Sequence, residues 1–547
     1  MDRREFLKCL AATGAWAALP AHALSASEWQ QVVDVQWGTT EDKGGPGTWD
    51  GVPLASPLAG NLAGTGPFQP AWDSLLQYDT PEWYRDAKFG IWAHWSPQCV
   101  PEEGDWYARS MYVEGSKNYL NHLQQYGHPS KVGYKDLCAQ WTLLNWDPEA
   151  MMERYQRTGA RLFLALANHH DGFDTWNSRH HAWNAVNVGP RRDVLAGWAA
   201  AARNRGLRFG ATVHAARNWW WFQVAHLSDQ KGPRAGKPYD GRLTAADGAN
   251  QWWEGLDPQS LYGRKHGVHD APDQAYVENF YRRTRDLIDQ LDPDLLYFDN
   301  TGLPLGWGGM NIGAYFYNRN LATRGGKMEA VLNIKGVPDR IAKGVVADYE
   351  RGVTDQIKPF PWQSETCIGE WHYARSRYAN HSYMKPGEVI HWLADAVSKN
   401  GTFILNIPGR PDGTNDPDEI AILEAIGRWM DINGEAIYST RPWKIYGEGP
   451  HAAKGGAFAG ESTSALDGRD VRYTRSKYGG TVYAIVLGWP EGDQIRLTGL
   501  AGERVGHVDV LGSAETLTWE AGDHALTVGR PAVRPSDYAV VFRVRLA

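Results

Sequence analysis

A helix followed by a buried strand recurs along the chain, and this order limits the fold more than any other feature of the sequence. Asp147 caps the first such helix, Gly159 ends it, and residues 160–168 (ARLFLALAN) follow as an apolar strand. The same order returns at residues 193–214 and 277–300. Strands that are apolar throughout are buried on both faces, so the pattern predicts a parallel sheet covered by helices.

Counting such strands gives eight, the number that closes a (β/α)8 barrel. Nearly every one ends with a polar side chain, and in such a barrel the carboxyl ends of the strands converge on the active site. These side chains are candidates for a pocket lining, whereas a doubly wound open sheet, the alternative fold, gives no reason for eight polar endings. The strands are predicted at 89–94, 161–168, 208–214, 295–299, 330–334, 345–350, 362–367 and 402–407, ending at His94, Asn168, His214, Asp299, Asn333, Glu350, Glu365 and Asn406.

The sequence changes character after the last of these strands. A helix is predicted from Asp416 to Gly434, and beyond it short alternating strands with glycine and proline turns continue to the C-terminus. We therefore predict an α/β chain in which a (β/α)8-like (TIM) barrel is followed by a β-sandwich. The expected divisions are a signal peptide at 1–23, an extended lead-in at 24–70, the barrel domain at 71–440 and the C-terminal β-sandwich at 441–547.

The N-terminal residues have the order of a twin-arginine export signal. Arg3 and Arg4 precede an apolar stretch at 9–19 and a small-residue cleavage site at 21–23. Such a stretch is too short to remain in a bilayer, and no other segment has about 18 continuous apolar residues. We expect an exported chain, periplasmic or secreted, without membrane contact after signal cleavage.

The composition favours a small or neutral ligand. The net charge of −7 disfavours nucleic acid as a partner, and the 27 tryptophans offer flat faces on which sugar rings stack, although most large aromatic side chains fill cores. Outside the predicted signal, Cys99, Cys138 and Cys367 form an odd set without a CxxC pair, so we expect buried thiols rather than disulfides or a zinc knuckle. The oligomeric state stays open, a homo-oligomer included.

Two strand-end acids fit the hydrolysis of a glycosidic bond, which needs one carboxyl group at the anomeric carbon and another to protonate the leaving oxygen. Asp299 follows an apolar strand, which would hold its carboxylate at a barrel mouth. Glu365 lies between Trp362 and Trp371, where partial desolvation would raise its pKa. Glu370 is the alternative acid, and a salt bridge with a nearby arginine is the alternative role for either glutamate.

Four histidines fall at predicted strand ends, so they could share one cavity: His94, His169, His170 and His214. A metal-dependent barrel hydrolase would use such residues. Against a metal, no HxH pair occurs among them, and adjacent residues such as His169 and His170 tend to point in different directions along a strand. Hydrogen bonds to sugar hydroxyls need no metal, so we favour a sugar site and expect neither a metal nor a cofactor.

Several segments carry a family resemblance. They are TPEWYRDAKFGIWAHWS (80–96), NHHDGFDTWNS (168–178), LLYFDN (295–300), SETC (364–367) and the stretch from GTFILNIPGRPDGT to NGEAIYSTRPW (401–443). Together they resemble the signatures of the retaining α-L-fucosidases of glycoside hydrolase family 29, and the similarity covers most of the mature chain. It implies a (β/α)8-like barrel joined to a C-terminal β-sandwich, with no metal requirement.

The resemblance also implies a role for each matching residue. Asp299 would be the nucleophile and Glu365 the acid/base, with Glu370 as the alternative. The implied enzyme is exo-acting and removes terminal α-L-fucose from a fucosylated oligosaccharide or polysaccharide with retention, through a covalent fucosyl-enzyme. For binding of fucose the resemblance implies His94, His169 and His170, with Trp106 lining the sugar pocket. His214, Arg351 and Trp371 are further substrate-binding candidates.

Some positions depart from the family pattern. Ser96 and Asn300 stand where relatives have glycine, and Tyr297 stands where they have tryptophan. Val213 and His214 replace a tyrosine pair. These changes leave an α-L-galactosidase open, because α-L-galactose adds only a hydroxyl on C6, which an apolar pocket rejects by about a hundredfold. A transfucosylase, a metal-dependent barrel hydrolase and a non-catalytic carbohydrate-binding protein also stay open.

Overall fold

The structure is a computed structural model that describes residues 48–49, 51–267 and 270–547. The signal peptide predicted at 1–23 lies outside the described residues, as does the lead-in up to residue 47. Among the described residues, no helix has both the length and the apolar character that crossing a membrane requires.

Eight parallel strands close into a barrel in the order in which they occur in the chain, and the last strand pairs with the first. This confirms the predicted barrel and excludes the open sheet. All eight strands coincide with predicted segments to within two residues at either end. They are β3 (Phe89–Ala93), β4 (Leu162–Asn168), β5 (Arg208–Val213), β6 (Leu295–Thr301), β7 (Val331–Lys335), β8 (Val346–Glu350), β9 (Trp362–Cys367) and β10 (Gly401–Asn406).

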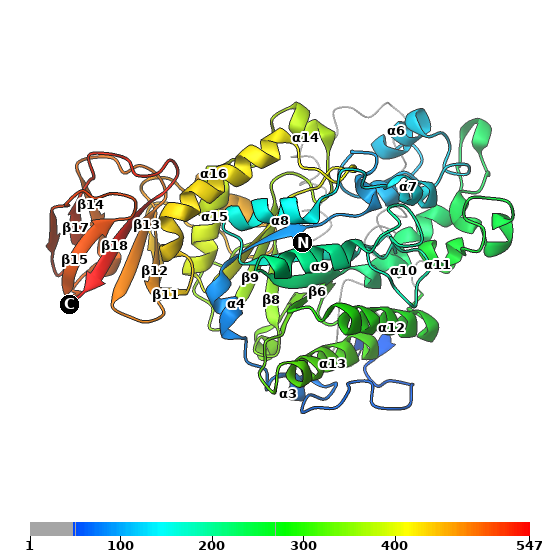
Figure 1. Ribbon diagram of the computed structural model, residues 1–547, viewed down its shortest axis with the longest axis horizontal. Coiled ribbons are helices and arrows are strands. Elements are labelled where there is room, and N and C mark those ends of the chain that lie inside the picture. The colour runs from blue at the N-terminus through cyan, green and yellow to red at the C-terminus, as the bar shows by residue number, and fades with distance from the viewer. Residues whose placement is uncertain (1–47, 50, 268–269) are drawn as a thin grey trace.

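Helices surround the barrel (Figure 1). The predicted caps are formed, because the side chain of Asp147 accepts a hydrogen bond from the backbone N–H of Ala150 (3.0 Å) and that of Asp193 from Ala196 (2.8 Å). The helices are α3 (Trp72–Leu75), α4 (Glu82–Ala87), α5 (Tyr107–Ser110), α6 (Lys117–Gln125), α7 (Tyr134–Gln140), α8 (Pro148–Arg157), α9 (Val194–Asn204), α10 (Asn218–Trp221), α11 (Pro258–Tyr262), α12 (Gln274–Leu291), α13 (Trp307–Thr323), α14 (Arg375–Ala379), α15 (Pro386–Ser398) and α16 (Pro417–Asn433).

The C-terminal region is a β-sandwich, as predicted. Two antiparallel sheets share one apolar core, to which Val482 and Val544 contribute from the larger sheet and Leu497 and Leu526 from the smaller. The larger sheet has the order β11 (Thr440–Glu448), β12 (Val471–Ser476), β13 (Thr481–Val486), β18 (Val540–Leu546) and β15 (Val505–Val510), and the smaller has β14 (Gln494–Leu497), β17 (Leu526–Gly529) and β16 (Trp519–Ala521). A further short pair, β1 (Thr48–Trp49) and β2 (Val52–Pro53), precedes the barrel.

The barrel and the sandwich are joined by a buried ionic contact. Arg472 of β12 donates to the carboxylate of Asp395 on α15 (2.7 Å), and Lys399 donates to its other oxygen (2.7 Å). All three side chains are at most 1% exposed. In Figure 1 the sandwich, coloured orange to red, lies beside α15 and α16 at one end of the molecule.

The three cysteines among the described residues, Cys99, Cys138 and Cys367, are free and buried, as the sequence predicts.

Candidate active site

A pocket lies at the carboxyl ends of the barrel strands. Every catalytic and substrate-binding candidate named from the sequence lines it except Glu370 and Arg351. The lining residues are Trp92, His94, Asp105, Trp106, His169, His170, His214, Tyr297, Asp299, Lys335, Glu350, Glu365, Trp371 and His372.

Three polar strand endings do not line the pocket, so the expectation that all eight would do so is wrong. Asn406 accepts a hydrogen bond from the backbone N–H of His94 (2.8 Å) and donates to the carbonyl of Trp371 (2.9 Å). Asn168 accepts from the backbone N–H of His214 (3.1 Å). Asn333 also lies outside the lining. The first two asparagines use their amides to hold the backbone on which lining side chains stand.

Asp299 stands where the pairing of β6 with β7 becomes irregular, just after Phe298. One carboxylate oxygen contacts the ammonium group of Lys335, and the other lies 3.2 Å from Nε2 of His170 and 3.2 Å from Nδ1 of His214. Burial alone would raise the pKa of Asp299, but Lys335 and the two histidines outweigh it and hold that pKa well below its ordinary value. The Asp299 carboxylate is therefore ionised at neutral pH, as a nucleophile must be.

The surroundings of Glu365 favour its protonated form, whereas those of Asp299 favour the ionised form. Its side chain is 1% exposed, Oε1 accepts a hydrogen bond from the hydroxyl of Tyr297 (3.0 Å), and Oε2 has no partner among the described residues. Burial and the neighbouring carboxyl of Asp348 raise the pKa of Glu365 well above its ordinary value. Two pocket acids with pKa values shifted apart provide one ionised group and one proton donor.

Lys335 connects the two acids. Its Nζ contacts Asp299, donates to Oε2 of Glu350 (2.6 Å) and lies 3.8 Å from Oε1 of Glu365. Burial would lower the pKa of Lys335, but four neighbouring acids, with Asp299 and Glu350 first, raise it well above its ordinary value, so this lysine stays charged. Through this shared contact, the oxygens of Asp299 and Glu365 lie at most about 6 Å apart, within reach of the roughly 5 to 5.5 Å spacing of retaining glycosidases.

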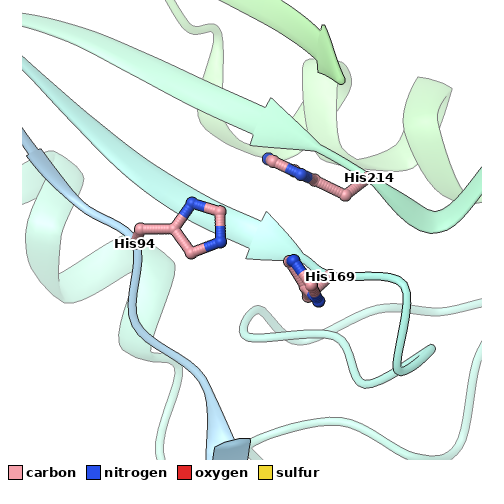
Figure 2. Close-up of side chains that lie close together, drawn as sticks. All are labelled: His94, His169 and His214. Carbon is pink, nitrogen blue, oxygen red and sulfur yellow. The ribbon is translucent and has the colours of Figure 1, made fainter. Parts of the chain in front are cut away.

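Three buried imidazoles, those of His94, His169 and His214, lie close together (Figure 2), and His214 is the one that contacts Asp299. Ligand nitrogens of the three lie within 4.8 Å of one another. Burial lowers the pKa of His94 and His169 well below the ordinary value and that of His214 to about 4, so all three are neutral. The side-chain amide of Gln98 lies 2.6 Å from Nδ1 of His169, while neither ring nitrogen of His94 has a hydrogen-bond partner among the described residues. Such a group can bind a hydroxyl-rich ligand or a metal ion.

His169 and His170 both line the pocket, with ring centroids 4.4 Å apart. The expectation that adjacent histidines point in different directions is wrong here, because β4 ends at Asn168 and its alternation of side chains does not extend into the turn that follows. His170 also contacts the carbonyl of His214 through Nδ1 (2.8 Å), which leaves Nε2 directed at Asp299.

Asp105, which lines the pocket, fixes the position of the backbone at Trp371 and His372, two further lining residues. The carboxylate of Asp105 accepts hydrogen bonds from the backbone N–H groups of Trp371 (3.1 Å) and His372 (2.8 Å). The next residue, Trp106, adopts a left-handed backbone conformation (φ 66°), which is strained for a bulky side chain. It is 42% exposed, so its ring is available at the entrance to the pocket.

Two sequence candidates lie outside the pocket lining. Glu370 accepts two hydrogen bonds from the guanidinium of Arg377 (3.0 and 2.5 Å), the salt bridge named as its alternative role. Arg351 donates from its backbone N–H to the carbonyl of Glu365 (2.7 Å), and its guanidinium lies 3.7 Å from the sulfur of Cys367.

Comparison with known proteins gives the family. The α-L-fucosidase profile matches residues 59–435, and the profile of the α-L-fucosidase C-terminal domain matches residues 467–545. Human tissue α-L-fucosidase is 27% identical over 489 residues (87% of this chain, 90% of the relative), and the α-L-fucosidase of Branchiostoma floridae is 26% identical (87% and 96%).

Solved structures show the same fold. The α-fucosidase of Thermotoga maritima has a TM-score of 0.65 at 23% identity, covering 87% of this chain and all of that one. A GH29 α-L-fucosidase from Bacteroides thetaiotaomicron, described as a trapped covalent intermediate, has a TM-score of 0.60 at 17% identity, covering 86% and 98%. Because the barrel profile alone spans more than half of the sequence, this chain belongs to the α-L-fucosidase family of glycoside hydrolases, family 29.

Proposed function

We propose that this protein is an exo-acting α-L-fucosidase that hydrolyses terminal α-L-fucosyl linkages of oligosaccharides or polysaccharides with retention, after export by a twin-arginine signal. The observation that supports it most is the pair of opposed acids, with Asp299 ionised beside Lys335 and Glu365 buried and inclined to keep its proton. The choice of fucose as the sugar rests on the names of the relatives, which are α-L-fucosidases.

In the first step the Asp299 carboxylate attacks C1 of the fucose. The bond from C1 to the leaving oxygen breaks as the bond to Asp299 forms, and Glu365 gives its proton to that oxygen. Because Oε2 of Glu365 has no protein partner among the described residues, it is the oxygen available to face the substrate.

In the second step the ionised Glu365 removes a proton from water, whose oxygen attacks C1 and releases Asp299. Since each attack inverts C1, the product keeps the α configuration. An alcohol in place of water would give transfer to another sugar, which is the reaction of a transfucosylase.

The histidine group is proposed to bind the sugar hydroxyls. A neutral imidazole offers one donor and one acceptor, which matches a hydroxyl group. His94, His169 and His214 are all neutral and lie within reach of a common ligand. Trp106 and Trp371, both at the pocket wall, would contact the ring faces of the substrate.

Release of 4-nitrophenol from the 4-nitrophenyl α-L-fucoside and α-L-galactoside tests the proposed reaction. We expect the fucoside to have the larger kcat/KM, by about a hundredfold, and EDTA to leave the rate unchanged. Preference for the galactoside would reassign the sugar, and loss of activity in EDTA with recovery on adding zinc would favour a metal-dependent hydrolase. Binding of L-fucose without turnover of any fucoside would identify a non-catalytic binding protein.

Replacing Lys335 with methionine is expected to move the acid limb of the kcat/KM profile to higher pH. Lys335 is the strongest of the groups that lower the pKa of Asp299, so its loss raises that pKa, and the nucleophile then ionises only at higher pH. The shift should be about one pH unit or more. It is measured with the aryl fucoside from pH 3 to pH 9, and an acid limb that stays in place would show that Lys335 does not set the ionisation of Asp299.

A further inference from the structure

The hydroxyl of Tyr297 lies between two buried acids. Its oxygen is 3.0 Å from Oε1 of Glu365 and 3.3 Å from Oδ2 of Asp348. Tyr297, Glu365 and Asp348 are 0%, 1% and 4% exposed, so water contributes little to satisfying these oxygens. Asp348 is not among the residues that line the pocket.

A phenol has only one hydrogen to donate, which limits how the three groups can be protonated. If Tyr297 donates to Glu365, its lone pairs face Asp348, and that contact is favourable only if Asp348 carries a proton. If Tyr297 donates to Asp348, the same argument places a proton on Glu365. Both arrangements use one carboxyl proton for the two acids.

The far side of Asp348 is also held in place. Its Oδ1 accepts a hydrogen bond from the side-chain amide of Gln363 (2.9 Å), whose own oxygen accepts from the hydroxyl of Tyr84 (3.2 Å). Gln363 and Tyr84 are fully buried. This fixed donor keeps Asp348 aimed at Tyr297.

We propose that Tyr297 and Asp348 are positioning residues for Glu365, and that the two acids, which hydrogen-bond to each other as well as to the Tyr297 hydroxyl, share a single proton. The inference rests on the proposed role of Glu365 as acid/base. With the proton on Glu365 the pair is set for the first step. Once Glu365 has given that proton to the leaving oxygen, both acids are ionised with only the Tyr297 hydrogen between them, and the charge of Asp348 makes the Glu365 carboxylate a stronger base for the water of the second step. The proton regained from water restores the starting arrangement.

The charges around the pair agree with this arrangement. Burial raises the pKa of Asp348 to about 7, and the charge of Asp348, after burial, is the main cause of the raised pKa of Glu365. The other charged groups facing Glu365 are Lys335 from β7, Asp299 from β6 and Glu350 from β8. Of these, Lys335 lowers the pKa of Glu365 and the two acids raise it.

The substitution Asp348→Asn keeps the shape of the side chain but removes its charge. We expect the alkaline limb of the kcat/KM profile, which reports loss of the Glu365 proton, to move to lower pH by about one unit or more, because a negative neighbour that favours the protonated acid is gone. Tyr297→Phe, which keeps the ring but removes the hydroxyl, should lower kcat/KM by about ten- to a hundredfold. The profile is measured with 4-nitrophenyl α-L-fucoside.

A substrate series separates proton transfer from general damage. With 2,4-dinitrophenyl α-L-fucoside, whose leaving group needs no protonation, both variants should approach the wild-type rate of the first step, and the defect should grow as the leaving group becomes more basic. Asp286→Asn is the matched control, since within the described part of the chain this 5% exposed acid on α12 bonds to the 176–179 segment and to Gln290, away from the pocket lining. It should leave the profile unchanged.

The outcomes distinguish the two proposals. An alkaline limb that stays in place in folded Asp348→Asn, or an equal loss with every leaving group, would overturn the shared proton. A wild-type protein that hydrolyses no fucoside would contradict the proposed function itself. If Asp348→Asn fails to fold, Tyr297→Phe decides, because an unaltered dependence on leaving group in that variant also overturns the inference.

Discussion

Replacing Asp299 with alanine is expected to lower kcat for 4-nitrophenyl α-L-fucoside by about 10⁴-fold or more, the scale of loss when a nucleophile is removed. The carboxylate that would bond to C1 is absent, and no other group takes its place, because Glu365 is inclined to stay protonated and Glu350 is engaged by Lys335. The variant should stay folded, because Lys335 keeps its ion pair with Glu350 when Asp299 is removed.

Adding azide to Asp299→Ala distinguishes loss of the nucleophile from general damage to the active site. A small anion that fits the vacated space should restore part of the rate, and it should give β-L-fucosyl azide, because it attacks from the face that Asp299 occupies. Asp289→Ala, which removes a partly exposed acid on α12, is the control and should keep full activity. Retention of more than about a tenth of the activity in Asp299→Ala would show that another residue is the nucleophile.

Replacing Asp395 with alanine is expected to destabilise the protein by about 3 to 5 kcal/mol, the usual cost of removing one partner of a buried ion pair. The change would leave Arg472 and Lys399 as neighbouring cations, both at most 1% exposed and without the carboxylate that both contact. Because Arg472 belongs to the sandwich and Asp395 to the barrel, the substitution should weaken the contact between the two domains.

Urea unfolding, followed by tryptophan fluorescence, measures the free energy of unfolding of both proteins. We expect the difference in the unfolding transition that occurs at the lowest urea concentration. Asp418→Ala is the matched control, since its ion pair with His381 lies at the surface and such pairs contribute about 1 kcal/mol or less. A shift in Asp395→Ala no larger than that of the control would show that the buried contact does not hold the domains together.

The barrel could be predicted from the sequence because most of its strands, although not β8 and β9, are apolar on both faces and most end in a polar residue. Local signals such as the Asp147 and Asp193 caps agree with the global order, and the structure forms both. The same reasoning found Asp299 and Glu365, because strand ends converge on the barrel mouth, although the asparagines at three other strand ends do not line the pocket.

The remaining site residues depend on how the strands lie beside one another. Lys335 reaches Asp299 only because β7 pairs with β6 in one particular register, and a lysine at a strand end carries no signal of that contact. Asp348 lies inside a predicted strand, where nothing in the local sequence shows that its neighbours are Tyr297 and Glu365. Pairing register, rather than composition or periodicity, is the information that a single sequence lacks.

Asp299 is proposed to form a covalent bond to C1 of fucose. The most direct measurement is mass spectrometry of the protein after reaction with 2-deoxy-2-fluoro-L-fucosyl fluoride, since the fluorine on C2 destabilises the oxocarbenium-like transition states and the fluoride leaving group still allows the first step. We predict one sugar per chain, carried on the peptide that contains Asp299. A sugar on Glu350 or Glu365, or an active enzyme that is never labelled and releases the β anomer from an α-L-fucoside, would contradict the account.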